Sequence, residues 1–258
     1  MATPAMQRYA AEIYRLQQDS QFVALTELSE HANSSAQATA RMVARMKKLN
    51  YLDHEKYRGV RLTTKGEKIA MPSLRRHRLV EVFLVKVMKY GWDEAHEISD
   101  SFALGVNDQI EDRIDEITEH PARCPHGEPI PSKDGVMPLV KDVNLLEVPS
   151  GSDCVISRVR THDGDKLRYF ADLGLVPGVK FHLFSCAPFK GPLNLQVKPN
   201  NHLIGYELAG SLWVEVTQLG EGNKLPPQAK INLGRRESLS SRTLWTRNSR
   251  TTRFHAFF

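Results

Sequence analysis

The sequence predicts a mainly α-helical N-terminal winged helix-turn-helix, an all-α dimerisation domain and a C-terminal small β-barrel of the SH3-like type. Three observations predict this fold class. Residues 1–63 combine helical periodicity with a final strand–turn–strand pattern, residues 72–141 carry helical apolar stripes, and residues 143–216 hold short apolar runs between turn residues. A chain of 258 residues, 41% of them hydrophobic, is long enough for several small cores.

The N-terminal domain, residues 1–71, begins with Thr3-Pro4, an N-cap followed by proline at the first helical position. Caps and periodicity then predict three helices and two strands, over residues 4–18, 26–32, 35–49, 51–55 and 60–63. Gly59 lies at the bend between the two strands. Three helices and a hairpin in this order describe a winged helix-turn-helix.

The charge of this domain suits a phosphate backbone, because residues 1–70 carry 11 Lys and Arg against 7 Asp and Glu. In this fold the third helix enters the major groove and the hairpin lies on the phosphates, so double-stranded DNA is the expected partner. The residues expected at base edges are Ser35, Gln37 and Arg41. The residues expected at phosphates are Arg45, Lys47, Lys48, Lys56 and Arg58. A solvated basic face on a small helical domain is the alternative.

The middle domain, residues 72–141, is organised around a helix predicted over residues 76–88, because Pro72 should kink or interrupt the helix before it. His77 and Glu81 stand four residues apart, which places imidazole and carboxylate on one helical face, within reach of a single cation. The spacing therefore predicts half of a metal site.

A later helix in this domain carries an isoleucine stripe at residues 110, 114 and 117. Such a stripe suits either the core or half of a homodimer interface. We favour the dimer, because two-fold symmetry matches the inverted half-sites that winged-helix proteins read.

Cys124 and His126 flank a proline, whose extended backbone can direct both side chains at one point. With His77 and Glu81 they offer one sulfur, two nitrogens and one oxygen, a set that suits Fe(II), Zn(II) or Co(II), and Mn(II) less well because of the thiolate. The alternative is a buried free cysteine beside a loop histidine. His96 by itself indicates a capping or surface residue.

Residues 142–219 are expected to form the small barrel. The predicted strands are residues 154–159, 173–178, 180–184, 193–197 and 212–216. Residues 220–258 are rich in Ser, Thr and Arg and carry a positive net charge, so we expect a disordered basic tail.

The composition excludes several classes of protein. Three cysteines, an odd number, do not form a disulfide framework. The N-terminus lacks the features of a signal peptide, and no apolar run reaches the length of about 18 residues that a membrane span needs. We therefore expect a cytoplasmic protein without a membrane partner. We find no independent catalytic motif, so an enzyme, such as a zinc hydrolase built on the same ligands, is not expected.

Over residues 1–216 the chain resembles the diphtheria toxin repressor and manganese transport regulator (DtxR/MntR) family. The matching stretches are residues 3–14, 43–46, 55–59, 76–79 and 124–131. The resemblance implies a metal-dependent repressor of metal-ion uptake and homeostasis genes, which binds inverted-repeat operators as a homodimer when Fe(II) or Mn(II) is bound. Zn(II) or Co(II) would serve as substitutes. Residues 173–178 also resemble the small barrel of ferrous-iron-uptake proteins.

The resemblance also implies a set of metal ligands. The matching positions are His77, Glu81, His96, Cys124 and His126. Streptococcal-type manganese regulators add an acid from the SH3-like domain. Asp163 is our candidate for that acid, with His162 and Asp165 as alternatives.

The family's second metal site depends on a ligand on the first helix and on a Glu-x-x-Glu-His type motif on a later one. This chain departs from that pattern at Arg8, Ala11, Ala103 and Leu104. Asp100 alone remains as a candidate ligand, so we expect the second site to be absent or much altered. The departures leave one alternative, a winged-helix regulator that does not need metal and is constitutive or redox-responsive through Cys124.

Overall fold

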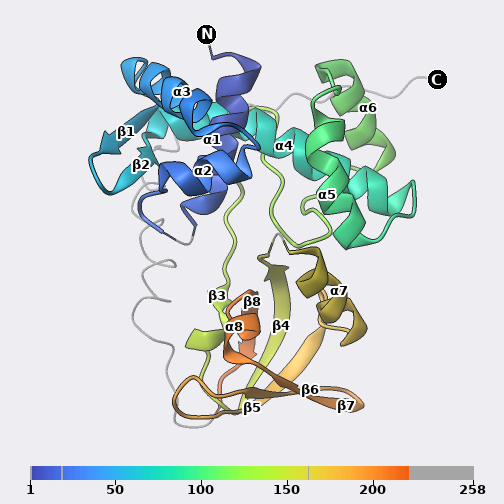
Figure 1. The fold of residues 1–258 in the computed structure, drawn as a ribbon. Helices are drawn as coiled ribbons and strands as arrows, with labels where there is room; N and C mark the ends of the chain where they lie inside the picture. The colour runs from blue at the N-terminus through green and yellow to red at the C-terminus, as the bar shows by residue number, and fades with distance from the viewer. Residues whose placement is uncertain (1, 19, 162, 221–258) are drawn as a thin grey trace, which may run out of the picture.

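The computed structural model describes residues 2–18, 20–161 and 163–220 (Figure 1). In this view the first six helices and a short β-hairpin form the upper part of the molecule, and a larger β-sheet with the later helices forms the lower part. The helices are α1 (Pro4–Leu16), α2 (Leu25–His31), α3 (Ala36–Lys48), α4 (Thr64–Lys86), α5 (Trp92–Ala103), α6 (Asp108–Ile117), the 3-10 helix η1 (Leu145–Glu147), α7 (Gly164–Asp172) and α8 (Tyr206–Ala209). The strands are β1 (Leu52–Glu55), β2 (Gly59–Leu62), β3 (Val143–Asn144), β4 (Ser152–Val159), β5 (Lys180–Cys186), β6 (Leu193–Val197), β7 (Asn200–Ile204) and β8 (Leu212–Gln218).

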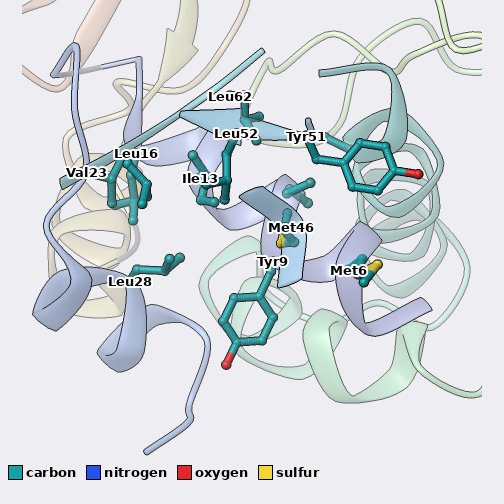
Figure 2. Packing of buried hydrophobic residues seen from close by; sticks show 14 of the residues in the cluster. Met6, Tyr9, Ile13, Leu16, Val23, Leu28, Met46, Tyr51, Leu52 and Leu62 are labelled. Carbon is teal, nitrogen blue, oxygen red and sulfur yellow. The ribbon is translucent and has the colours of Figure 1, made fainter. Parts of the chain in front are cut away.

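The first three helices and the β1–β2 hairpin, which we call the head, form the predicted winged helix-turn-helix. Thr3 caps α1 by accepting a hydrogen bond from the Met6 amide, and Ser35 caps α3 by accepting one from the Ala38 amide. The apolar faces of these elements share one core (Figure 2). This core includes Met6, Tyr9, Ile13, Leu28, Met46 and Leu52. The core holds α3 against the rest of the head, and the polar face of α3 is exposed.

Helix α4 runs without interruption from Thr64 to Lys86, with Pro72 inside it. Pro72 therefore does not interrupt the helix, and the prediction that a helix begins at residue 76 is wrong. A proline inside a helix costs roughly 3 kcal/mol, because one backbone hydrogen bond is lost. Burial offsets this cost, since Leu74 packs in the core of the head and Leu79 packs in the core beneath α5 and α6. One helix thus joins the head to the middle of the molecule.

Helices α5 and α6 pack on the second half of α4 and share a separate core with it. Arg75 of α4 is buried and holds α6 in place, with its Nε 3.0 Å from a carboxylate oxygen of Glu111. In the isoleucine stripe, Ile114 is buried in this core, whereas Ile110 and Ile117 are exposed. The stripe therefore has one member facing the core and two facing outward.

Among the described residues, the C-terminal sheet has six antiparallel strands in the order β3-β8-β4-β5-β6-β7. The sheet is not closed into a barrel, so the predicted barrel is wrong in this respect. Closure requires the two edge strands to pair with each other. Here β3 consists of two residues paired with β8, and β7 pairs with β6. Helix α7 instead covers part of the core with the buried side chains of Leu167 and Phe170.

The strand predicted over residues 173–178 is also wrong. This stretch turns from α7 into β5, and Gly174 and Gly178 adopt positive φ angles of 69° and 92°. Helix α7 and strand β7 were not predicted at all. The tail predicted over residues 220–258 lies, beyond Gly220, outside the described residues. No helix in the described ranges is long and apolar enough to cross a bilayer.

Candidate metal centre

Five side chains from three segments meet between the head and the sheet. Helix α4 supplies His77 and Glu81, α5 supplies His96, and the loop before the sheet supplies Cys124 and His126. The four-residue spacing on α4 places the first two on one face, as predicted. Both α4 side chains, the cysteine and the loop histidine are buried. We call these five residues the Glu81 cluster.

One carboxylate oxygen lies at the centre of this cluster. Oε1 of Glu81 is 3.1 Å from Nε2 of His77, 2.9 Å from Nδ1 of His96 and 3.2 Å from Nδ1 of His126. The sulfur of Cys124 is 3.8 Å from Nδ1 of His126. Two sets of donor atoms each lie within 4.8 Å of one another: His77, Glu81 and His96, and Glu81, Cys124 and His126. The donors converge as a metal-binding set does.

The charges of the cluster depend on one another. Burial alone would raise the pKa of the Glu81 carboxyl, but the imidazoles of His126 and His77 lower it well below its ordinary value. Burial and Arg15 lower the pKa of His77, yet Glu81 and Asp100 outweigh them and raise it. The cluster therefore holds a carboxylate that attracts positive charge, whether from protons or from a metal ion.

The thiol of Cys124 carries a proton at neutral pH. Burial, followed by the nearby Glu81 carboxylate, raises its pKa well above the ordinary value. A thiol binds metal as thiolate, so a cation that used this sulfur would have to displace the proton.

The orientation of His126 is set by Trp92 at the start of α5. Nε2 of His126 lies 3.0 Å from the backbone carbonyl of Trp92 and donates to it, and the two rings stack with centroids 5.4 Å apart. The other ring nitrogen, Nδ1, therefore faces the cluster. Metal-binding histidines commonly use this arrangement, in which a hydrogen bond to one nitrogen directs the other at the ion. Trp92 was not among the candidate site residues predicted from the sequence.

The loop that carries Cys124 and His126 is attached to strand β4 of the sheet. The amide of Val159 donates to the His126 carbonyl at 2.9 Å. Gly127 has a φ of +85°, and a Cβ at this position would lie 2.0 Å from the carbonyl oxygen of Ser157. Only glycine combines this backbone conformation with such close contact to β4. The position of the loop donors is therefore tied to the C-terminal sheet.

A cavity of about 690 Å³ between the head, α4, the loop and the sheet reaches the cluster. The cluster residues that line it are His77, Glu81, His96, Cys124 and His126. A small cation entering this cavity would meet all five side chains.

The acid expected from the C-terminal domain is not brought to the cluster. Asp163 is exposed and caps α7, where its Oδ1 accepts hydrogen bonds from the amides of Asp165 and Lys166 at 2.9 and 3.2 Å. The side chain of Asp165 pairs with Arg168 on the same helix. His162 lies outside the described residues. Among the described residues, the donors of the cluster therefore come from helices and the loop.

Asp100 belongs to neither donor set. Its Oδ1 lies 2.7 Å from Nδ1 of His77, an ion pair when that imidazole is protonated. In the described ranges, both donor sets contain Glu81, and neither includes residues 8, 11, 103 or 104. The positions that depart from the family's second site therefore contribute no donor to these sets. The sequence analysis missed two residues of α1: Arg15, whose Nη1 lies 3.7 Å from Asp100, and the buried Glu12, which pairs with Arg15. The helical period places Glu12 one turn after Tyr9 on the buried face of α1, and this was the available signal for Glu12. Arg15 lies two residues after Ile13, on the opposite side of the helix, so the period gave no signal for it.

The residues expected to contact DNA lie on the surface of the head. Ser35 caps α3, which occupies its hydroxyl oxygen as an acceptor. The remaining residues of this set, all exposed, are Gln37, Arg41, Arg45, Lys47, Lys48, Lys56 and Arg58. At the hairpin tip Arg58 pairs with Glu55 at 2.7 Å and lies over the ring of Phe22. The head thus presents exposed basic side chains on both α3 and the hairpin.

Three family models match consecutive parts of the chain. The N-terminal DNA-binding domain of iron-dependent repressors matches residues 1–60, their metal-binding and dimerisation domain matches residues 63–132, and the FeoA domain matches residues 143–216.

Two curated relatives represent the sequence matches. The iron-dependent repressor IdeR of Mycobacterium leprae is 29% identical over 184 residues, which cover 67% of this chain and 80% of the relative. The transcriptional regulator MntR of Oceanobacillus iheyensis is 35% identical over 121 residues, which cover 46% of this chain and 71% of the relative.

Solved structures match over most of the chain. A manganese-dependent transcriptional repressor in complex with manganese superposes with a TM-score of 0.75 at 30% identity, covering 82% of this chain and 99% of that one. IdeR of T. acidophilum superposes with a TM-score of 0.72 at 26% identity, covering 84% and 99%. The helical head, the middle helices and the sheet therefore recur together.

Proposed function

Because the chain belongs to the diphtheria toxin repressor and manganese transport regulator family of metal-dependent transcriptional repressors, we propose that it represses genes of metal-ion uptake and homeostasis. The activating ion in this proposal is Fe(II) or Mn(II), the ions named for its relatives. The convergence of three imidazole nitrogens and a cysteine on Glu81 carries the proposal. The relatives are iron- and manganese-dependent repressors, so a regulator that does not need metal is not supported. These relatives are named as repressors and not as enzymes.

The proposed ligands are the five residues of the Glu81 cluster. Sulfur, nitrogen and oxygen donors together suit Fe(II), and also Zn(II) and Co(II) as substitutes, while Mn(II) favours the carboxylate and imidazoles. A bound divalent ion would supply positive charge that replaces the protons of Cys124 and His77. Asp163 and Asp100 are not part of this ligand set, because the first caps α7 and the second lies against His77 and Arg15 and belongs to neither donor set.

Metal binding would link three segments that otherwise depend on separate contacts: α4, α5 and the loop attached to β4. Helix α4 also packs in the core of the head, so the position of His77 is mechanically connected to the recognition helix α3. An ion that binds one arrangement of these segments more tightly shifts the population toward it. A coupling free energy of roughly 1–3 kcal/mol would change DNA affinity about 5- to 150-fold.

The proposed DNA complex is a dimer on an inverted repeat. Phe102 and Leu104 near the end of α5, and Ile110 and Ile117 on α6, are exposed apolar side chains on neighbouring elements. A second copy covering them would place two heads on two-fold-related half-sites. In each head, the start of α3 would meet base edges and the later basic side chains would meet phosphates.

The test is a titration of DNA binding with metal. Fluorescence anisotropy of a labelled inverted-repeat DNA would be followed with anaerobic Fe(II), and with Mn(II), Co(II), Zn(II) or a chelator. We expect tighter binding with metal than with chelator, and loss of the difference in Glu81→Gln. The matched control is Glu207→Gln, which removes an exposed carboxylate in the C-terminal domain. Equal DNA affinity with metal and with chelator would refute the proposal.

A further inference from the structure

Arg15 places a buried positive charge between the head and the Glu81 cluster. It belongs to α1, and its neighbours Ile13 and Leu16 pack in the core of the head. Its guanidinium Nη1 lies 2.7 Å from Oε1 of Glu12 on the same helix and 3.7 Å from Oδ1 of Asp100 on α5. The side chain of Arg15 is only 10% exposed, so it is held in this position by its surroundings.

Asp100 connects this charge to the metal centre. The same oxygen that faces Arg15 lies 2.7 Å from Nδ1 of His77. Nε2 of His77 in turn lies 3.1 Å from the central oxygen of Glu81. Charged contacts thus run from α1 through α5 to α4, and they form a second connection between head and cluster beside the continuous helix α4.

The charge on Arg15 is permanent. Burial opposes it, but Glu12, Asp100 and Glu81 together raise the pKa of the guanidinium above its ordinary value. Without Arg15, the carboxylates of Glu12 and Asp100 would both lose the guanidinium that lies beside them. A carboxylate next to an imidazole orients that imidazole for metal binding. Arg15 holds the carboxylate that lies beside His77.

We propose that Arg15 is a positioning residue that transmits occupancy of the metal centre to the head through Asp100, which deepens the function proposed above and rests on it. When His77 binds an ion through Nε2, its Nδ1 keeps its proton and faces Asp100. Asp100 then holds Arg15, and with it α1, in the arrangement that binds DNA. Arg15 itself does not bind the ion.

The test compares Arg15→Met, Arg15→Lys, Asp100→Asn and the double variant Arg15→Met/Asp100→Asn with the wild type. The matched control is Lys166→Met, which removes an exposed basic partner of Glu207. DNA affinity is measured with Mn(II) and with chelator. Mn(II) affinity is measured separately in the absence of DNA. Amide hydrogen exchange of α1 is followed in the metal-free and Mn(II)-loaded protein.

We expect Arg15→Met to reduce the metal-induced gain in DNA affinity about two- to fivefold, as expected for the loss of one ion pair. Arg15→Lys should restore part of this gain because it keeps the charge, and the double variant should match Asp100→Asn alone because both residues act in one chain of contacts. Mn(II) should slow hydrogen exchange of α1 in the wild type and less so in Arg15→Met.

Two results separate this proposal from the proposed function. A wild type without any metal response would overturn both. A wild type that responds to metal, with Arg15→Met responding equally and its α1 exchange unchanged, would overturn the role of Arg15 alone. Effects of Arg15→Met and Asp100→Asn that simply add in the double variant would also overturn it, as would failure of the lysine variant to restore any coupling. If Arg15→Met does not fold, the exposed Asp100→Asn variant must still lose coupling.

Discussion

Replacing Glu81 by glutamine should weaken metal binding about 100-fold. The substitution keeps the size and one oxygen of the side chain and removes its negative charge. Two opposite unit charges 3.1 Å apart, the distance from Glu81 to His77, attract by about 5 kcal/mol at an effective dielectric of about 20. Desolvation of the buried groups cancels part of this attraction. A net loss of about 3 kcal/mol corresponds to about a 100-fold weaker metal affinity.

The assay is competition for Mn(II) or Co(II) against a chelating dye, at pH 7.5 and without DNA. Thermal unfolding of the same samples, with and without metal, shows whether the variant is folded and whether metal still stabilises it. Glu207→Gln should bind metal as the wild type does. A metal affinity of Glu81→Gln within about threefold of the wild type would show that the Glu81 carboxylate does not bind the ion.

Three further predictions concern protons, the loop and the dimer. Metal affinity should rise with pH through the neutral range, because the pKa of Cys124 lies well above its ordinary value and each ion that binds the sulfur must displace a proton. Co(II) titrations at several pH values should show a smaller slope of metal affinity against pH in Cys124→Ser than in the wild type. An unchanged slope would exclude the thiol as a ligand. Gly127→Ala should lower both thermal stability and metal affinity, because its Cβ would meet the Ser157 carbonyl. Gly174→Ala, also at positive φ but in open space, should change neither the metal affinity nor the position of the loop. Equal metal affinities in these two variants would contradict the attachment of the loop to β4. Ile117→Glu should shift sedimentation toward the monomer and weaken DNA binding while leaving Mn(II) affinity unchanged, and a dimer that persists would move the interface elsewhere.

Local signals in the sequence were sufficient for the head. Thr3-Pro4 and Ser35 predicted the starts of α1 and α3, and the structure places both as caps. These signals act through hydrogen bonds within three residues, so they do not depend on the rest of the fold. The same holds for His77 and Glu81, whose spacing alone puts them on one helical face.

Predictions failed where distant packing decides the local conformation. Pro72 lies inside α4 because that helix is buried at both ends of its length, in two different cores. Residues 173–178 are apolar enough for a strand but form a turn, because α7 occupies the preceding residues. The sheet remains open because its edge strands, β3 and β7, do not pair with each other, and no short stretch of sequence reports this.

For the candidate site, the sequence by itself determined the donor types and the spacing of His77 with Glu81 and of Cys124 with His126. Only the tertiary structure decided that these pairs and His96 converge on one carboxylate oxygen, that Asp163 lies elsewhere, and that Arg15 lies beside Asp100. The reason is physical: periodicity relates side chains on one element, whereas the distance between α1, α4, α5 and the loop follows from how their cores pack against one another.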